Sequence, residues 1–265
     1  ADNLTFEVDV CGDGDDLALC LHGFPEHSFS WRYQLPMLAD AGFTAWAPNL
    51  RGYGNSSRPE GLQAYRLDEL VEDVARLIEA SGKSEVTLIA HDWGAVIAWQ
   101  FALRKRLPLQ RLVICNVPHP QAMQDAFGWT QLKKSWYILF FQLPWLPEYL
   151  LGKDRAEPIA EMFRKTSANA GQFPTDVREV YRRNAAQPGA LTAMVNFYRA
   201  LLRGDRSRPR TDPRTPIDVP TLMVWGEDDV ALSKSTTLTT GDYVNDFTIR
   251  YLPGVSHWVQ QEQPE

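Results

Sequence analysis

Features that are common in other proteins are scarce in this sequence, and each scarcity excludes a class of protein. No segment approaches 18 uncharged apolar residues, so we expect no membrane-spanning helix. The net charge of −6 leaves no basic surface, so nucleic acid is not an expected partner. The three cysteines, Cys11, Cys20 and Cys115, are odd in number and lack metal-ligand spacing. We expect them as small core residues in a reducing compartment.

The termini and the bulk composition set further bounds. The opening A-D-N-L-T-F lacks the basic and then apolar pattern of a secretion signal, which favours a cytoplasmic location. Because the chain does not begin with Met, removal of an export signal stays open as an alternative. The 265 residues suffice for one large α/β domain or for a domain with an insertion.

Short apolar runs alternate with helical patterns in much of the chain. Strands are expected at 17–21, 43–47, 86–90, 111–117, 221–225 and 247–252, and the three-and-four spacing of apolar residues predicts a helix over 67–80. Alternating strands and helices indicate an α/β fold with a mostly parallel sheet that helices cover on both faces. In such sheets, ligands bind at the carboxyl ends of the strands.

The pattern changes between residues 118 and 216. Strand-like runs are absent there, and the segment is helical and rich in aromatic residues. We therefore expect a core formed by residues 1–117 and 217–265, with a helical lid (118–216) inserted in it.

The stretch 86–99, V-T-L-I-A-H-D-W-G-A-V-I-A-W, passes from a buried strand into a helix. Ala90 and Gly94 are small, as a sharp strand-to-helix turn requires, and such a turn pushes its central side chain, here Asp92, out above the sheet. An Asp before a helix is also a common N-cap. Asp92 alone is thus balanced between a helix cap and a nucleophile.

Polar residues at later strand ends favour the nucleophile. Asp229 lies in W-G-E-D-D after the strand at 221–225, and His257 lies in G-V-S-H-W after the last strand. The order Asp92, Asp229, His257 is the nucleophile, acid, histidine order of α/β-hydrolase triads. Asp228 is the alternative acid.

Several motifs together resemble the epoxide hydrolase branch of the α/β hydrolases along essentially the whole chain. They are H-G-F-P-E at 22–26, R-G-Y-G at 51–54, H-D-W-G at 91–94, V-P-H-P at 117–120, N-F-Y-R at 196–199, W-G-E-D-D at 225–229 and S-H-W at 256–258. The resemblance implies an Asp nucleophile that opens an epoxide, an Asp–His pair that activates water, and two lid tyrosines that polarise the epoxide oxygen.

Residue by residue, the resemblance implies roles for a defined set of side chains. The catalytic residues would be Asp92, Asp229, His257, Tyr137 and Tyr198; the oxyanion hole would use the N–H groups of Phe24 and Trp93; the substrate pocket would include His22, Pro25, Trp93, Phe141 and Trp258. Tyr149 is the competitor of Tyr137. The expected partners are a small apolar epoxide and water, with no metal, no other cofactor and no nucleic acid.

Other functions on this fold remain alternatives. A haloalkane dehalogenase shares the H-D-W-G motif and the Asp–His pair, but Phe24 stands where those enzymes usually carry Asn, and a halide prefers N–H donors to phenols. Trp93 argues against a fluoroacetate dehalogenase, which would carry Arg beside the nucleophile. An intact triad argues against a non-catalytic binding protein, and Asp92 in place of Ser excludes a serine esterase.

The sequence departs from the family pattern in two residues and at its end. Asn49 stands where Asp is common, and Ala90 replaces the usual first Gly of the turn. The family normally has a further helix after the histidine loop, whereas this chain ends at Glu265. We expect that helix to lie outside the sequence, or a partner to cover the exposed face.

Overall fold

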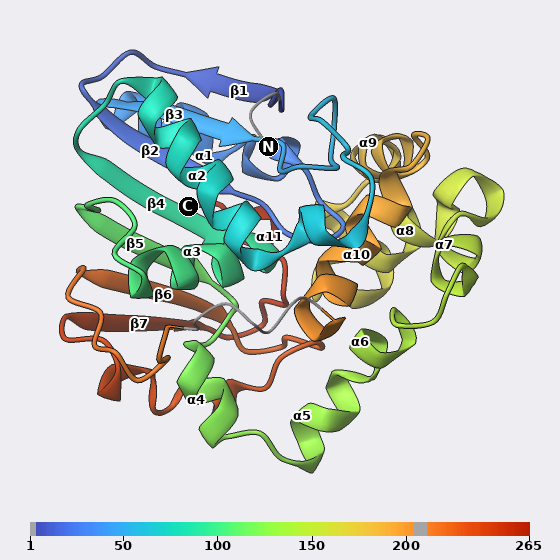
Figure 1. Ribbon diagram of the computed structural model, residues 1–265. Helices are drawn as coiled ribbons and strands as arrows, with labels where there is room; N and C mark the ends of the chain where they lie inside the picture. The colour runs from blue at the N-terminus through green and yellow to red at the C-terminus, as the bar shows by residue number, and fades with distance from the viewer. Residues whose placement is uncertain (1–3, 204–210) are drawn as a thin grey trace.

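The computed structural model describes residues 4–203 and 211–265, and its described strands form one mostly parallel sheet (Figure 1). The strand order is β1-β3-β2-β4-β5-β6-β7, and only the edge pair β1 and β3 is antiparallel. The strands are β1 (Val8–Cys11), β2 (Asp16–Leu21), β3 (Phe43–Pro48), β4 (Val86–His91), β5 (Arg111–Cys115), β6 (Thr221–Gly226) and β7 (Phe247–Leu252). The predicted α/β class and parallel sheet are confirmed.

The alternation of side chains along β2 shows how both faces of the sheet are covered. Leu17, Leu19 and Leu21 pack in one apolar cluster with helices α2 (Leu67–Ser81) and α3 (Trp93–Leu103). Ala18 and Cys20 point the other way, toward α1 (Gln34–Asp40) and α11 (Val259–Glu262). This period of two in a strand that is buried along its length requires apolar residues on both faces, which explains the continuous apolar run.

Most of the described chain between β5 and β6 is helical. The helices are α4 (Pro120–Asp125), α5 (Trp129–Lys134), α6 (Trp136–Phe140), α7 (Leu146–Leu151), α8 (Lys153–Thr166), α9 (Thr175–Ala185) and α10 (Ala190–Arg203). Short 3₁₀ helices complete the described part: η1 (Ser28–Trp31), η2 (Leu62–Tyr65), η3 (Ala170–Gln172), η4 (Lys234–Thr237) and η5 (Thr240–Asp242). Figure 1 shows α5 to α10 gathered at one end of the sheet, on the right of the view. None of the described helices is long and apolar enough to span a membrane.

The turn between β4 and α3 holds Asp92 in a strained conformation. Its φ of 46° and ψ of −118° lie in a backbone region that residues other than glycine rarely adopt. Holding a residue there typically costs about 1–3 kcal/mol of folding free energy. Two glycines make the turn possible. A Cβ on Gly23 would lie 2.3 Å from Cβ of Asp92, and one on Gly94 would lie 2.3 Å from the carbonyl oxygen of Leu21.

This crowding predicts that Gly94→Ala destabilises the fold. The added methyl meets backbone that cannot move aside, so we expect the free energy of unfolding to fall by about 3 kcal/mol in urea titrations. Gly241→Ala is the matched control, because its added Cβ would lie at an ordinary 3.6 Å from Phe247 Cδ1. The control should change the free energy by less than about 1 kcal/mol. Equal effects of both substitutions would contradict the role of close packing at the turn.

Candidate active site

The Asp92 carboxylate faces loops from other strands instead of its own helix. It lies at the N-cap position of α3 but makes no side-chain cap hydrogen bond. Its Oδ1 instead accepts the backbone N–H of Phe24 at 2.7 Å. The N-cap interpretation is therefore wrong. Trp93 is the first residue of α3, so its backbone N–H lies beside Asp92 at the helix N-terminus.

His257 lies between two carboxylates. Its Nδ1 is 2.7 Å from Oδ2 of Asp229, and its Nε2 is 3.6 Å from Oδ2 of Asp92. Burial by itself would lower the pKa of His257, but the two carboxylates outweigh burial and raise it well above 6.5. Burial likewise would raise the pKa of Asp92 and of Asp229, yet contact with His257 holds both below 3.8. Both carboxylates thus favour the protonated form of His257.

Donors besides His257 hold the Asp229 carboxylate. Its Oδ1 accepts the backbone N–H groups of Ala231 and Leu232 at 2.7 and 2.9 Å, and its Oδ2 accepts Asn116 Nδ2 at 2.7 Å. Asn116, which the sequence analysis missed, follows β5 directly and has a φ of 49°. A polar residue at the end of a parallel strand was the available signal. Asp228, the alternative acid, is exposed.

Another buried carboxylate, that of Glu26, is linked to the backbone of His257 through His91. Its Oε2 lies 2.8 Å from Nδ1 of His91, whose Nε2 donates to the carbonyl oxygen of His257 at 2.8 Å. Glu26 also accepts the backbone N–H of Gly23 and the side-chain amides of Gln260 and Gln261. Burial would raise the pKa of Glu26, but His91, His22 and the N–H of Gly23 lower it below 4.5. Glu26 therefore connects the loop after β2 and, through His91, the end of β4 to the backbone of His257.

An apolar cavity of about 330 Å³ opens above Asp92 and His257. Its other lining residues come from three loops of the core, from helices α5, α6, α8 and α10, and from the residue that follows α6: Phe24, Lys134, Trp136, Tyr137, Phe141, Met162, Thr166, Tyr198, Val230, Ala231 and Trp258. Phe141 and Trp258, both named from sequence, are among them. Lys134 Nζ donates to the backbone carbonyls of Asp229 and Leu232, which fixes the loop that carries the acid.

Two tyrosines meet in this cavity. The rings of Tyr137 and Tyr198 are 5.8 Å apart, and Tyr198 also packs edge-to-face against Phe24 at 5.4 Å. Burial, with the Asp92 charge as the next cause, raises the pKa of both phenols well above 10. Both side chains therefore keep their protons and can donate hydrogen bonds. Tyr149 lies outside the cavity, exposed to solvent beneath Lys153.

The chain is similar in sequence to a known protein family and to several of its members. Residues 18–263 match the family model of the alpha/beta hydrolase fold. Epoxide hydrolase 2 of Caenorhabditis elegans is 37% identical over 96% of this chain and 71% of its own length. The chain belongs to the epoxide hydrolase branch of the α/β hydrolase family. Human epoxide hydrolase 4 is 35% identical over 99% of this chain and 73% of its own.

Solved structures agree with this family. A mutant epoxide hydrolase from Bacillus megaterium, crystallised with a naphthyloxy-propanediol product, superposes with a TM-score of 0.87. It is 30% identical, and the match covers 98% of this chain and 93% of that one.

Three residues expected in the pocket of this α/β hydrolase do not line its cavity. The His22 ring is buried behind it, where Nε2 accepts the backbone N–H of Leu50 and burial lowers the pKa to about 4. The Trp93 ring packs behind Tyr198, 5.0 Å away, and against Phe197. Pro25 follows Phe24 through a cis peptide bond, and it is Phe24 that reaches the cavity. The prediction of His22, Pro25 and Trp93 as lining residues was wrong.

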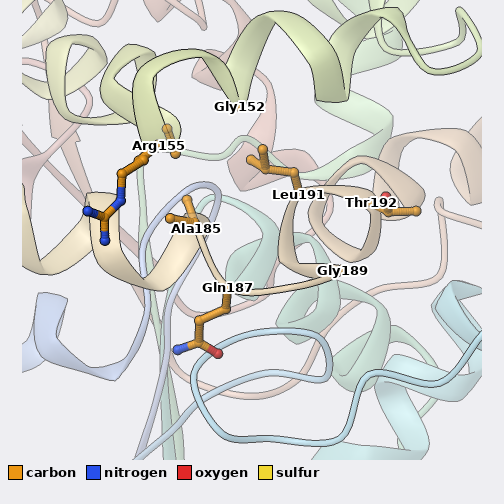
Figure 2. A pocket seen from close by; sticks show the side chains of 9 residues that line it. Gly152, Arg155, Ala185, Gln187, Gly189, Leu191 and Thr192 are labelled. Carbon is orange, nitrogen blue, oxygen red and sulfur yellow. The ribbon is translucent and has the colours of Figure 1, made fainter.

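A second cavity of about 250 Å³ lies between the start of α8 and the turn from α9 to α10 (Figure 2). The side chains around it include Arg155, Gln187, Leu191 and Thr192, and none of the predicted catalytic residues lines it. Within 4–203 and 211–265, no group of three His, Cys, Asp or Glu side chains could hold a metal ion. Of these two cavities, the one above Asp92 is the one that brings predicted catalytic side chains together.

The buried position of Glu26 predicts a pH-dependent contribution to stability. Because its folded-state pKa is lowered, the stabilisation is present above pH 4.5 and is lost as the pH falls through the folded-state value. Glu26→Gln, which leaves buried donors without an acceptor, should lower the free energy of unfolding at pH 7 by about 3 kcal/mol. The difference from the unmodified protein should shrink below pH 4.5. The exposed Glu85→Gln is the control, and a Glu26→Gln effect that does not change with pH would contradict the assignment.

Proposed function

We propose that this protein hydrolyses apolar epoxides to vicinal diols through an ester formed on Asp92. The observation that carries the proposal is the meeting of Asp92 with two phenols, Tyr137 and Tyr198, in one apolar cavity. A carboxylate can attack carbon and form an alkyl ester, whereas the phenols suit an oxygen leaving group. The names of the relatives in this family support the same reaction.

In the first step, an Asp92 carboxylate oxygen attacks an epoxide carbon, and the carbon–oxygen bond of the ring breaks. The departing oxygen gains negative charge and takes a proton from one of the phenols. Because Tyr137 and Tyr198 remain protonated in this dry site, both can donate to that oxygen as charge develops. The Asp92 charge is consumed in the new ester.

The loss of that charge prepares the second step. The negative charges of Asp92 and Asp229 both raise the pKa of His257. Alkylation of Asp92 removes one of these charges, so the pKa of His257 falls. His257, oriented by Asp229, then gives up a proton to the phenolate and acts as a base through Nε2 on a water molecule. The water gives a proton to His257 as it attacks the carbonyl carbon of the ester, and the N–H groups of Phe24 and Trp93 stabilise the oxyanion. The bond from the carbonyl carbon to the diol oxygen then breaks, the diol oxygen takes the proton from His257, and the new Asp92 carboxyl returns a proton to His257.

The cavity indicates the substrate class. Its lining is largely aromatic and aliphatic and includes Trp136, Met162 and Trp258. A volume of about 330 Å³ suits a small apolar substrate such as an aryl or alkyl epoxide. The naphthyloxy-propanediol bound to the B. megaterium relative is a reaction product that also carries an aromatic group. We further propose that residues 118–216 act as a lid, because α5, α6, α8 and α10 of this segment contribute lining residues to the cavity. Residues 204–210 of the segment lie outside the described residues.

The choice of substrate and nucleophile is tested by supplying a styrene-oxide-type epoxide and, separately, a haloalkane. We expect diol from the epoxide and no halide release, and Asp92→Asn should lower diol formation by at least about a thousandfold because an amide is a poor nucleophile. Gas chromatography of the diol and a halide electrode measure the products. Halide release without diol would assign the site to haloalkane dehalogenation instead.

The tyrosines predict a separate kinetic signature. Tyr137→Phe and Tyr198→Phe should each slow alkylation of Asp92 about a hundredfold, the usual effect of losing one hydrogen-bond donor to developing charge. Tyr149→Phe is the matched control and should leave the rate unchanged, because Tyr149 is exposed and outside the cavity. Single-turnover stopped-flow fluorescence measures the step. A Tyr149→Phe effect as large as that of Tyr137→Phe would reverse our assignment of the first tyrosine.

A further inference from the structure

An unusual stripe of apolar side chains faces solvent along α5, α6 and the loop to α7. Of fifteen large apolar side chains exposed in the described chain, eight fall within residues 127–149. Six of them form what we call the stripe: Trp129, Leu132, Trp136, Leu139, Leu143 and Trp145. Trp129 is 80% exposed and Trp145 69%, far more than Trp residues normally are in a folded protein. Figure 1 shows α5 and α6 at the outer edge of the molecule, away from the sheet.

The helices that carry the stripe reverse the usual amphipathic arrangement, because a polar side chain faces the protein and apolar side chains face solvent. The side of α5 that faces the protein is polar: Gln131 is buried and bonds to the backbone of Ala231 and Ser233 and to Ser135. The stripe residues of these two helices, Trp129, Leu132, Trp136 and Leu139, are spaced by three or four and are exposed. Hydrogen bonds thus fix the orientation in which the apolar face meets the surroundings. An apolar face held outward in this way marks an interaction surface.

The charges around the stripe are positive, although the whole chain carries −6. Residues 126–147 contain two lysines and no acidic residue. Exposed cations border the stripe at Lys133, which follows Leu132, and at Arg203, which donates to the carbonyl oxygen of Gln142. Lys153 lies over the exposed Tyr149 and is followed by the exposed acid Asp154, while Arg155 comes next in the chain. The acid that follows, Glu148, is paired with Arg199 at 2.5 Å, so its charge is balanced.

The stripe is continuous with the mouth of the catalytic cavity. Trp136 is 63% exposed, belongs to the stripe and lines the cavity above Asp92. Val230, also exposed, lines the same cavity from the core side. A molecule leaving an apolar phase against the stripe would therefore reach the cavity without crossing bulk water.

We propose that the stripe docks on the surface of a lipid bilayer that contains anionic lipids. Trp and Leu side chains enter the boundary between headgroups and acyl chains, and the bordering cations contact lipid phosphates. A second copy of the chain is a poorer occupant, because a symmetric pair would bring Lys133 and Arg203 of both copies together. Docking is independent of the chemistry at Asp92. Delivery of apolar substrate from the bilayer to the cavity rests on the proposed function.

Sedimentation with vesicles tests docking without any enzymatic readout. The full chain should bind vesicles of phosphatidylcholine mixed with phosphatidylglycerol, and bind vesicles of phosphatidylcholine alone more weakly. Trp129→Gln combined with Leu139→Gln should lower partitioning about a hundredfold, because each apolar side chain inserted contributes about tenfold. Lys133→Gln should lower it about fivefold on the mixed vesicles only.

Matched controls separate the stripe from general surface effects. Leu238→Gln replaces a leucine that is 71% exposed elsewhere, and Lys165→Gln replaces an exposed lysine of α8; both should partition as the unmodified protein does. Failure of the unmodified protein to bind the mixed vesicles, or equal binding of the double variant, would overturn the proposal. Equal binding to both vesicle types would overturn the proposal that the stripe prefers a bilayer with anionic lipids. Self-association that depends on the stripe, without vesicle binding, would assign it to a second copy.

Discussion

The strained turn at Asp92 is the constraint on which the rest of the site depends. A side chain with a φ of 46° persists only where neighbouring backbone leaves it no alternative. Gly23 and Gly94 let the loop after β2 and the start of α3 approach the turn closely, and the N–H of Phe24 then holds the carboxylate. The same approach carries Phe24 to the cavity and His22 away from it. One backbone conformation therefore sets both the position of the carboxylate and the shape of the cavity floor.

The charges buried around this turn are arranged before any substrate enters. Asp229 is satisfied by Asn116 and by two backbone N–H groups besides His257, so its carboxylate has little freedom to move. On the other side, Glu26 and His91 hold the backbone of His257. Burial of these groups is costly in itself, and the hydrogen bonds offset that cost only in this one geometry. Such preorganisation lets an imidazole respond to the charge of Asp92 alone, because its other contacts stay fixed.

The periodicity of apolar residues was sufficient to predict most strands of the fold. The positions of polar residues just after strands were sufficient to predict part of the candidate site. The runs at 17–21 and 86–90 are buried on both faces, so composition alone marked them as strands of a parallel sheet. The edge strand β1 was missed because it is short and half exposed, and it pairs only with β3. Asn116 and Glu26 were missed because their partners are distant in the chain, and no local pattern reports such contacts. Asn116 lies 113 residues from Asp229, and Glu26 lies 65 residues from His91 and 234 from Gln260. His22 and Trp93 were misplaced because proximity to Asp92 in sequence does not say which way a ring turns.

In the proposed reaction, Asp92 becomes covalently bound to substrate and is then released by water. The most direct measurement is a single turnover with an epoxide in ¹⁸O-water, using enzyme in excess, followed by mass spectrometry of the peptide that contains Asp92 and of the diol. We expect the label to enter the Asp92 carboxylate and the diol to carry none, because the diol oxygen comes from the enzyme. Label in the diol with an unlabelled Asp92 would mean that water attacks the epoxide directly and that no ester forms on Asp92.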